Sequence, residues 1–384
     1  NRIGCPRYAE YPRPDLSRGQ RPTPWPQDGD KGVGLGIIEW PPEVSRRAAR
    51  SRARPYFFLI VSPAMCRRSI RSRPGLPAAS AQPRPNQPGL RLWDSRKHIV
   101  VIRFFILAYG QEHIDLFDAI AWPSLMQPRN KAAIPHDCVF SVYSDAASMA
   151  ALVQSIEMQN RGTIEAHIID PGANHYNVQV AALMEEMRVC AANGDALVVV
   201  NPDCFWGDGS LANLLAIAGE QNICIASPHV RVDQKRFLLW LRNLWLETND
   251  IPAIDNPRLV SVAMDMLHPS WIDADISRSE TNTFYTGISL QRLSDGLYAI
   301  GHLLPTIFYA KPTAADYAFF AENRHVPGLW DHHWPERVVE SGRYRTVTSS
   351  DAVCIVELTK AETHSTPLAP VDRSETMKFC RSGS

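Results

Sequence analysis

The sequence predicts an α/β fold with a mostly parallel sheet that helices cover on both faces. Two observations carry this prediction. From residue 98 onward, short β-rich apolar runs alternate with segments of helical periodicity, an order typical of parallel sheets. The run 197–200 is continuously apolar and contains three valines, as in strands buried on both faces. After residue 228 the alternation becomes less regular, so we expect a less regular C-terminal half.

The individual elements follow from the same periodicities. Strands are predicted at 98–107, 138–143, 163–169, 197–200 and 223–226, with helices at 114–121, 145–159, 176–192 and from 211 between them. The later elements are helices at 235–247, 256–267 and 314–322, meander strands at 284–290 and 297–303, and a hairpin of 344–348 with 352–358.

Residues 1–97 differ from the rest in composition. They hold 19 of the 40 Lys and Arg residues, 7 of the 40 Asp and Glu residues, and 15 of the 30 prolines. No apolar period is sustained, so this region cannot bury enough surface to offset its ordering entropy. We therefore predict that 1–97 is a disordered or non-native extension, that 98–360 forms the α/β domain, and that 361–384 is a polar tail.

Charge, cysteine content and hydropathy limit the partners. The acidic balance of residues 98–384 argues against nucleic acid, because phosphate binding needs clustered cations. Eight cysteines without CxxC spacing indicate reduced thiols, and hence a cytoplasmic protein. No run of 18 apolar residues predicts a transmembrane helix. The Leu- and Trp-rich helix at 235–247 either docks on the sheet or lies on a membrane surface, which would make the protein membrane-peripheral.

The segment after strand 197–200 is the first candidate for a binding site. Pro202 in Asn201-Pro202-Asp203 cannot donate to a ladder, so strand pairing ends there. Ligands of open α/β sheets bind outside the carboxyl ends of strands, which makes Asp203 the leading candidate; a structural Asx turn is the alternative. The motifs GxxxxGK[ST], HExxH and GxSxG do not occur, and no GxGxxG follows the first strand.

This succession of units, with an acidic tripeptide after a central strand, resembles the GT-A class of nucleotide-sugar glycosyltransferases, including bacterial-like members. The resemblance covers roughly residues 98–310 and implies a GT-A or Rossmann-like fold. It makes 98–227 the nucleotide-binding half and 228–360 the acceptor-side half. Tyr109, Gly110 and Gln111 stand where the class has its first nucleotide-contacting loop.

The resemblance also implies how a metal would be held. Asn201 and Asp203 would contact the donor, with Mg²⁺ or Mn²⁺ bound together with the nucleotide-sugar. Asn201 stands where the class has its first aspartate, and an amide brings no charge to the cation, so we expect Asp208 to supply the second carboxylate beside Asp203. The adjacent His332 and His333 are an alternative place for a metal.

The predicted activity is transfer of a sugar from a nucleotide-sugar to an unknown glycan, lipid or protein hydroxyl. In an inverting enzyme, a carboxylate takes the proton of that hydroxyl. The candidate bases are Asp265, Asp316, Asp331 and Asp351, of which we expect Asp331 and Asp351 to act; a turn-capping role is the alternative for Asp351. Two other classes stay open: a catalytically degenerate nucleotide- or glycan-binding protein, and another doubly wound enzyme such as a nucleotidyltransferase.

Overall fold

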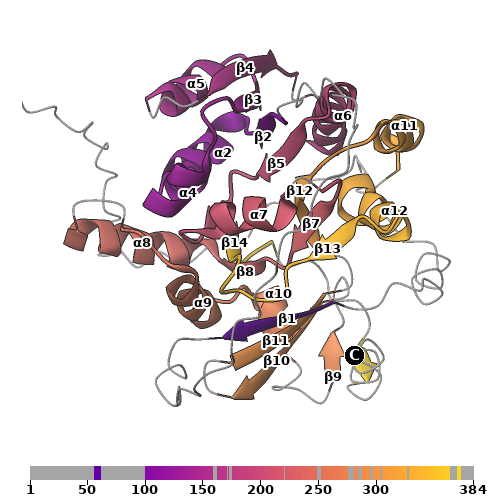
Figure 1. The fold of residues 1–384 in the computed structure, drawn as a ribbon. Helices are drawn as coiled ribbons and strands as arrows, with labels where there is room; N and C mark the ends of the chain where they lie inside the picture. The colour runs from indigo at the N-terminus through magenta and orange to yellow at the C-terminus, as the bar shows by residue number, and fades with distance from the viewer. Residues whose placement is uncertain are drawn as a thin grey trace, which may run out of the picture. The chain divides into compact units, whose positions relative to one another are not determined.

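Figure 1 draws the fold, which comes from a computed structural model. The structure describes residues 56–61, 100–158, 162–170, 172, 175–219, 221–248, 252–275, 281–283, 288–294, 297–302, 305–326, 328–363 and 370–372. All of them lie in the unit Arg52–Ser384, and the other unit of the chain, Asn1–Ser51, lies outside the described residues.

A seven-stranded sheet forms the centre of this unit and confirms the predicted fold class. Its order is β13-β7-β12-β5-β2-β3-β4. Neighbouring strands are parallel, except that β12 runs antiparallel to both β5 and β7. The strands are β2 (Ile102–Leu107), β3 (Val139–Ser144), β4 (Thr163–Ile168), β5 (Ala196–Val200), β7 (Cys224–Ser227), β12 (Thr306–Ala310) and β13 (Tyr344–Thr346).

Helices cover both faces of the sheet, because successive side chains of a strand point to opposite sides. On β2, Phe104 and Ile106 belong to one core and Phe105 belongs to the other. The first core includes α2 (Gly110–Leu116), the π-helix η2 (Phe117–Ala121), α3 (Trp122–Leu125), α5 (Met149–Glu157) and α7 (Ser210–Ala218). The second includes α6 (His175–Asn193), α11 (Ala314–Asn323), η3 (Leu329–His333) and α12 (Trp334–Glu340). Figure 1 shows α6, α11 and α12 on one side of the sheet.

A small sheet is attached at the carboxyl end of β5. Its strands are β6 (Cys204–Trp206), β14 (Ile355–Thr359) and β8 (Val230–Asp233). The strand β14 lies in the middle, antiparallel to β6 and parallel to β8. The predicted hairpin of 344–348 with 352–358 is therefore wrong. The strand β13 pairs with β7 in the central sheet, whereas β14 pairs with β6 and β8 in the small sheet.

The other strands form two peripheral ladders. The strand β11 (Leu297–His302) pairs antiparallel with β10 (Ile288–Ser294), which confirms the predicted meander, and also with β1 (Tyr56–Val61). The strands β9 (Thr281–Thr283) and β15 (Pro370–Asp372) pair with each other. We did not predict β1, which falls within 1–97. The rest of that region lies outside the described residues, so its assignment as an extension stays a prediction.

The remaining helices are α4 (Pro128–Ala133), α8 (Gln234–Thr248), α9 (Asn256–Asp265) and α10 (Pro269–Asp273). The helices predicted at 235–247 and 256–267 are thus present. The strand β12 was not predicted, because its five residues directly follow Pro305 and are too few to show a clear period.

A buried network of charges ties β2 and β3 to α6. The Arg103 side chain is buried, and its Nε donates to Glu186 Oε2 at 2.9 Å. Its Nη2 donates to Ser141 Oγ at 2.9 Å and to Glu165. The hydroxyl of Tyr143 donates to Glu186 Oε1 at 2.8 Å, so both carboxylate oxygens of this buried glutamate are paired. Pairing of this kind is required, because a lone charge inside a protein is strongly unfavourable.

We expect Arg103→Ala to lower the free energy of unfolding by about 3 to 5 kcal/mol, because the Glu186 carboxylate would stay buried without its cation. Urea unfolding measures this loss. The matched control is Arg188→Ala, which removes an exposed ion pair with Glu185 of 2.6 Å and should cost less than about 1 kcal/mol. Similar losses for the two variants would contradict the role given to burial.

Candidate functional site

Four parallel strands end at the same edge of the central sheet. In the ladders, Ile106 lies beside Val200 and Leu107 lies beside Tyr143, while Ser144 lies beside Ile168. Because these strands are parallel and in register, the segments that follow them leave the sheet from neighbouring positions. These segments begin at residues 108, 145, 169 and 201.

The order of the strands reverses between β2 and β5. From β2 the chain moves outward to β3 and β4, and it then returns to β5 on the other side of β2. The connections that follow β2 and β5 therefore run to opposite sides. Open α/β sheets bind ligands at such a switch point, outside the carboxyl ends of the strands.

The segment after β2 is joined to the segment after β3 by one carboxylate. Gly110 has a backbone φ of +71°, which residues with a Cβ rarely adopt. Its N–H donates to Asp145 Oδ2 at 2.8 Å. Asp145 Oδ1 accepts from the N–H groups of Ala147 and Ser148 at 3.0 and 2.9 Å. These bonds, and that of Gly110 first, lower the pKa of Asp145. Tyr109, before Gly110, is half-buried.

The predicted contact residue Gln111 is exposed at the start of α2. Its Nε2 donates to Asp115 Oδ1 at 2.7 Å. Burial raises the pKa of the Tyr109 hydroxyl, and the Tyr109 carbonyl lies 3.0 Å from His113 Nδ1. The structure therefore places Tyr109, Gly110 and Gln111 together at the switch point, where their nucleotide contacts stay a prediction.

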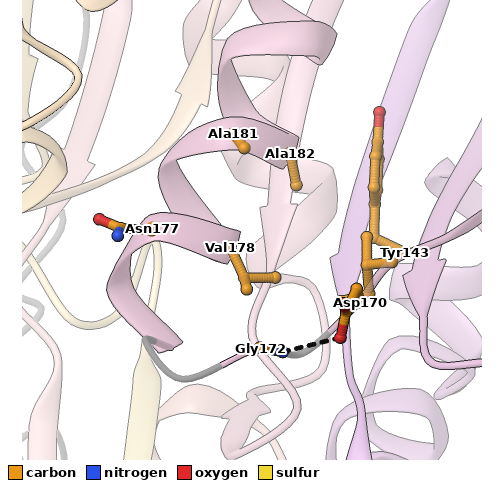
Figure 2. A pocket seen from close by; sticks show the side chains of 8 residues that line it. Tyr143, Asp170, Gly172, Asn177, Val178, Ala181 and Ala182 are labelled. Carbon is orange, nitrogen blue, oxygen red and sulfur yellow. Dashed lines mark hydrogen bonds between the residues drawn. The ribbon is translucent and has the colours of Figure 1, made fainter.

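A hollow of about 560 Å³ lies at the same edge, beside the ends of β3 and β4 and the first turns of α6 (Figure 2). Figure 2 shows Val178 and Ala182 of α6 facing Tyr143, and Asp170 accepting from the Gly172 N–H, a bond of 3.0 Å. The Tyr143 ring stacks on His167 at 4.5 Å. The volume falls within the range of small-molecule sites, and the lining is mostly apolar. The full lining is Tyr143, Ile169, Asp170, Gly172, Asn177, Val178, Ala181 and Ala182.

A cluster of four ionisable residues lies at the end of β5. Asp203 directly precedes β6, and its carbonyl accepts from the Leu358 N–H at 2.9 Å. On the middle strand of the small sheet, Glu357 lies beside Arg231. Arg231 Nε donates to Glu357 Oε1 at 2.9 Å, and His229 Nε2 lies 2.5 Å from Oε2. Both partners of Glu357 come from the start of β8 or the residue before it.

The environment shifts the pKa values of the two carboxylates of this cluster, Asp203 and Glu357, in opposite directions. Burial, followed by the negative charge of Glu357, raises the pKa of Asp203 to about 7. Burial would also raise the pKa of Glu357. The positive charges of Arg231 and then His229 outweigh this effect and lower the pKa of Glu357 to about 2. Glu357 is thus held ionised, whereas Asp203 takes up and releases a proton near neutral pH. Such a divergence typically marks acid and base roles.

Asp208 has a structural role. It is buried, and its Oδ1 accepts from the N–H groups of Arg129 and Asn130 at 2.8 and 3.3 Å, at the start of α4. Among the described residues, no group of three or more His, Cys, Asp and Glu side chains could hold a metal ion. The residues at this edge therefore do not fit a divalent ion held by the protein alone. The predicted metal role of Asp203 and Asp208 stays a prediction.

The predicted bases lie in different surroundings. Asp316 is buried and engaged by Thr313, Arg343 and the Trp334 indole, so it stabilises the start of α11. Asp351 is exposed in the turn before β14. Asp331 belongs to η3, and its charge acts on Tyr176 at the start of α6, whose pKa burial raises to about 12.

Of the predicted bases, Asp265 ends α9, with its carbonyl accepting from Arg236. The side chain of His332 lies outside the described residues, and His333 Nδ1 lies 3.9 Å from Glu336. None of these observations tests the catalytic roles of Asp331 and Asp351, which stay predictions.

Sequence reasoning missed Glu357, Arg231 and His229. A usable signal was present, because the short apolar segments 229–233 and 355–359 each carry charged residues at alternate or central positions. A charge on a strand that is otherwise apolar must be paired when it is buried. The pairing itself could not be predicted, because it joins residues more than 120 positions apart.

Comparisons with known proteins found similar solved structures. No family model and no curated protein matches the chain. The chain is similar to a 4-diphosphocytidyl-2C-methyl-D-erythritol synthase from Anaerococcus prevotii (10% identity, TM-score 0.32, 74% of this chain and 96% of that chain). It is also similar to core-mannan synthase A from Aspergillus fumigatus in a Mn/GDP form (11% identity, TM-score 0.29, 78% and 91%). TM-scores this low carry no argument about function.

The Asp203–Glu357 pair predicts a pH dependence of stability. A pKa raised from about 4 in the unfolded chain contributes stability that is present below pH 4 and lost as the pH rises through about 7. The lowered pKa of Glu357 has the opposite effect: it contributes stability at neutral pH that is lost as the pH falls toward 2. From pH 5 to 8, Asp203→Asn should therefore gain about 2 to 3 kcal/mol of unfolding free energy relative to the unmodified protein.

Urea unfolding at pH 5, 6, 7 and 8 measures this difference. Glu357→Gln is the companion variant: it removes the negative charge beside Asp203 and so lowers the folded-state pKa of Asp203, which should make the pH-dependent loss of stability smaller and end it at lower pH. A difference between Asp203→Asn and the unmodified protein that stays constant from pH 5 to 8 would contradict the raised pKa.

Proposed function

We propose that the protein is a glycosyltransferase that transfers a sugar from a nucleotide-sugar to an acceptor hydroxyl. The observation that carries the proposal is the position of Asp203 at the switch point between β2 and β5, with a pKa close to neutral. The donor class rests on the resemblance to GT-A enzymes. It is consistent with the sheet that the structure contains.

The carboxylates at this edge suit the nucleoside part of such a donor. Ribose hydroxyls and the N–H groups of a base are hydrogen-bond donors, which a carboxylate accepts. Asp170 borders the hollow beside Tyr143, and Asp145 holds the Gly110 segment in place. We assign the nucleoside to this end of the edge. The sugar then lies toward Asp203, across β2.

In the proposed reaction Asp203 is the general base. As the acceptor oxygen attacks the anomeric carbon, its proton moves to the Asp203 carboxylate. The bond between that carbon and the diphosphate oxygen breaks, and the nucleoside diphosphate leaves with the electron pair. Glu357 is a poor base, because Arg231 and His229 occupy its two oxygens and lower its pKa to about 2. Its charge keeps the pKa of Asp203 high enough for a base at neutral pH.

The first part of the test is binding. A thermal-shift series with UDP-, GDP-, CDP- and dTDP-sugars, each with and without Mn²⁺, should show stabilisation by one nucleotide class, because a ligand of the folded state stabilises by mass action. Free sugars should have no effect. Stabilisation by a nucleoside triphosphate, with pyrophosphate released when a sugar phosphate is added, would instead identify a nucleotidyltransferase.

The second part is turnover, read as release of nucleoside diphosphate when water replaces the acceptor. Asp203→Asn should still bind the donor but lose about 10²- to 10⁴-fold in rate, as expected for loss of a general base. Asp351→Asn tests the alternative base predicted from the sequence, and it should keep its rate if Asp203 is the base. The assignment of the base to Asp203 is wrong if Asp351→Asn is the variant that loses turnover. No shift with any nucleotide-sugar would overturn the proposed function itself.

A further inference from the structure

The helix α8 is the feature of the described chain that the proposed function leaves without a role. It has 15 residues and directly follows β8, the strand that carries Arg231. One side is buried in the core through Phe237, Leu241 and Leu244. This side explains why the helix forms, and it confirms that α8 docks on the body of the protein.

The opposite side of α8 is both apolar and cationic. Leu239 is 58% exposed and Leu246 is 70% exposed. Lys235 and Arg242 are exposed as well, and the four residues follow a spacing of four, three and four, which places them along one stripe of the helix. The other large apolar side chains exposed on the described residues occur singly, on different elements.

Half-buried side chains extend this stripe. Leu238 and Trp245 adjoin it on one flank, and both also pack against the core. On the other flank lie Arg236, Asn243 and Glu247, all exposed. The exposed surface of α8 thus carries three cations and one anion around two exposed leucines. Leucine and tryptophan beside lysine and arginine form the composition of helices that lie in the plane of a membrane interface.

We propose that this surface, Lys235, Arg236, Leu239, Arg242 and Leu246, docks α8 on an anionic lipid bilayer. The leucines would enter the boundary between headgroups and acyl chains, and the cations would contact lipid phosphates. Charge complementarity determines which side of the protein faces the membrane. Residues 98–384 carry an excess of 12 acidic groups, so most of this part is repelled by an anionic surface, whereas α8 is attracted.

Docking through α8 would keep the protein on one face of the membrane. No described helix is long and apolar enough to cross a bilayer. No loop separates α8 from β8, the strand that carries Arg231, because β8 ends at Asp233 and α8 begins at Gln234. A membrane-bound α8 would therefore hold the candidate site at a fixed position relative to the lipid surface.

Vesicle co-sedimentation of the full chain tests the proposal without any measurement of activity. The probes are vesicles of phosphatidylcholine alone and of phosphatidylcholine with 30% phosphatidylserine, the latter at about 0.05 and 0.5 M salt. The unmodified protein should sediment with the anionic vesicles at low salt. Leu239→Ser/Leu246→Ser should bind at least about tenfold more weakly, and Lys235→Glu/Arg242→Glu should bind the anionic vesicles more weakly than the unmodified protein does.

Met158→Ser is the matched control, because Met158 is 72% exposed at the end of α5, away from this stripe, and its removal should not change sedimentation. Circular dichroism of each variant confirms that it is folded. The proposal is overturned if the unmodified protein does not sediment with anionic vesicles, or if the leucine variant binds as strongly. It is also overturned if light scattering shows a dimer that only the leucine variant dissociates, since a second copy would then cover this surface.

Discussion

The parallel register of β2 with β3 and β5 is the constraint on which the candidate site depends. It places the ends of these strands side by side, so that the Gly110 segment, Asp145 and the segment leading to Asp203 leave one edge of the sheet. The buried Arg103–Glu186 pair supports this register from within, because it joins β2 and β3 to α6 through Ser141 and Tyr143. A change in the packing of α6 would therefore reach the hollow beside Tyr143 directly.

The small sheet of β6, β14 and β8 adds the electrostatic part of the site. Its middle strand carries Glu357 to the end of β5, and β8 carries the cations that hold Glu357 ionised. The partial burial of Asp203 and the charge of Glu357 together raise the pKa of the Asp203 carboxyl. The same chain segment continues into α8, so the candidate site and the proposed membrane surface are consecutive along the chain.

Sequence patterns predicted the central fold well, because the strands β2, β3, β4, β5 and β7 and the helices α2, α5, α6 and α7 are local elements with clear periods. They failed where pairing is non-local. The strand β12 (residues 306–310) lies in the middle of the sheet, between β5 and β7. The strand β14 does not pair with β13, which precedes it in sequence, but with β6 and β8. Asp203 could be predicted as a site residue because it follows the end of a strand. Glu357, Arg231 and His229 could not be predicted, because only the non-local pairing of β14 with β8 brings them together. The capping role of Asp208 likewise needed α4, whose short segment gave no helical period.

The central claim is that a nucleotide-sugar binds across the ends of β2, β3 and β5. Hydrogen exchange of the full chain, followed by mass spectrometry with and without the nucleotide-sugar that stabilises it most, tests this directly. The account predicts slower exchange in peptides covering 107–112, 143–149 and 200–206, with α9 and the β10–β11 ladder unchanged. Protection confined to segments away from this edge, with those three peptides unaffected, would contradict it.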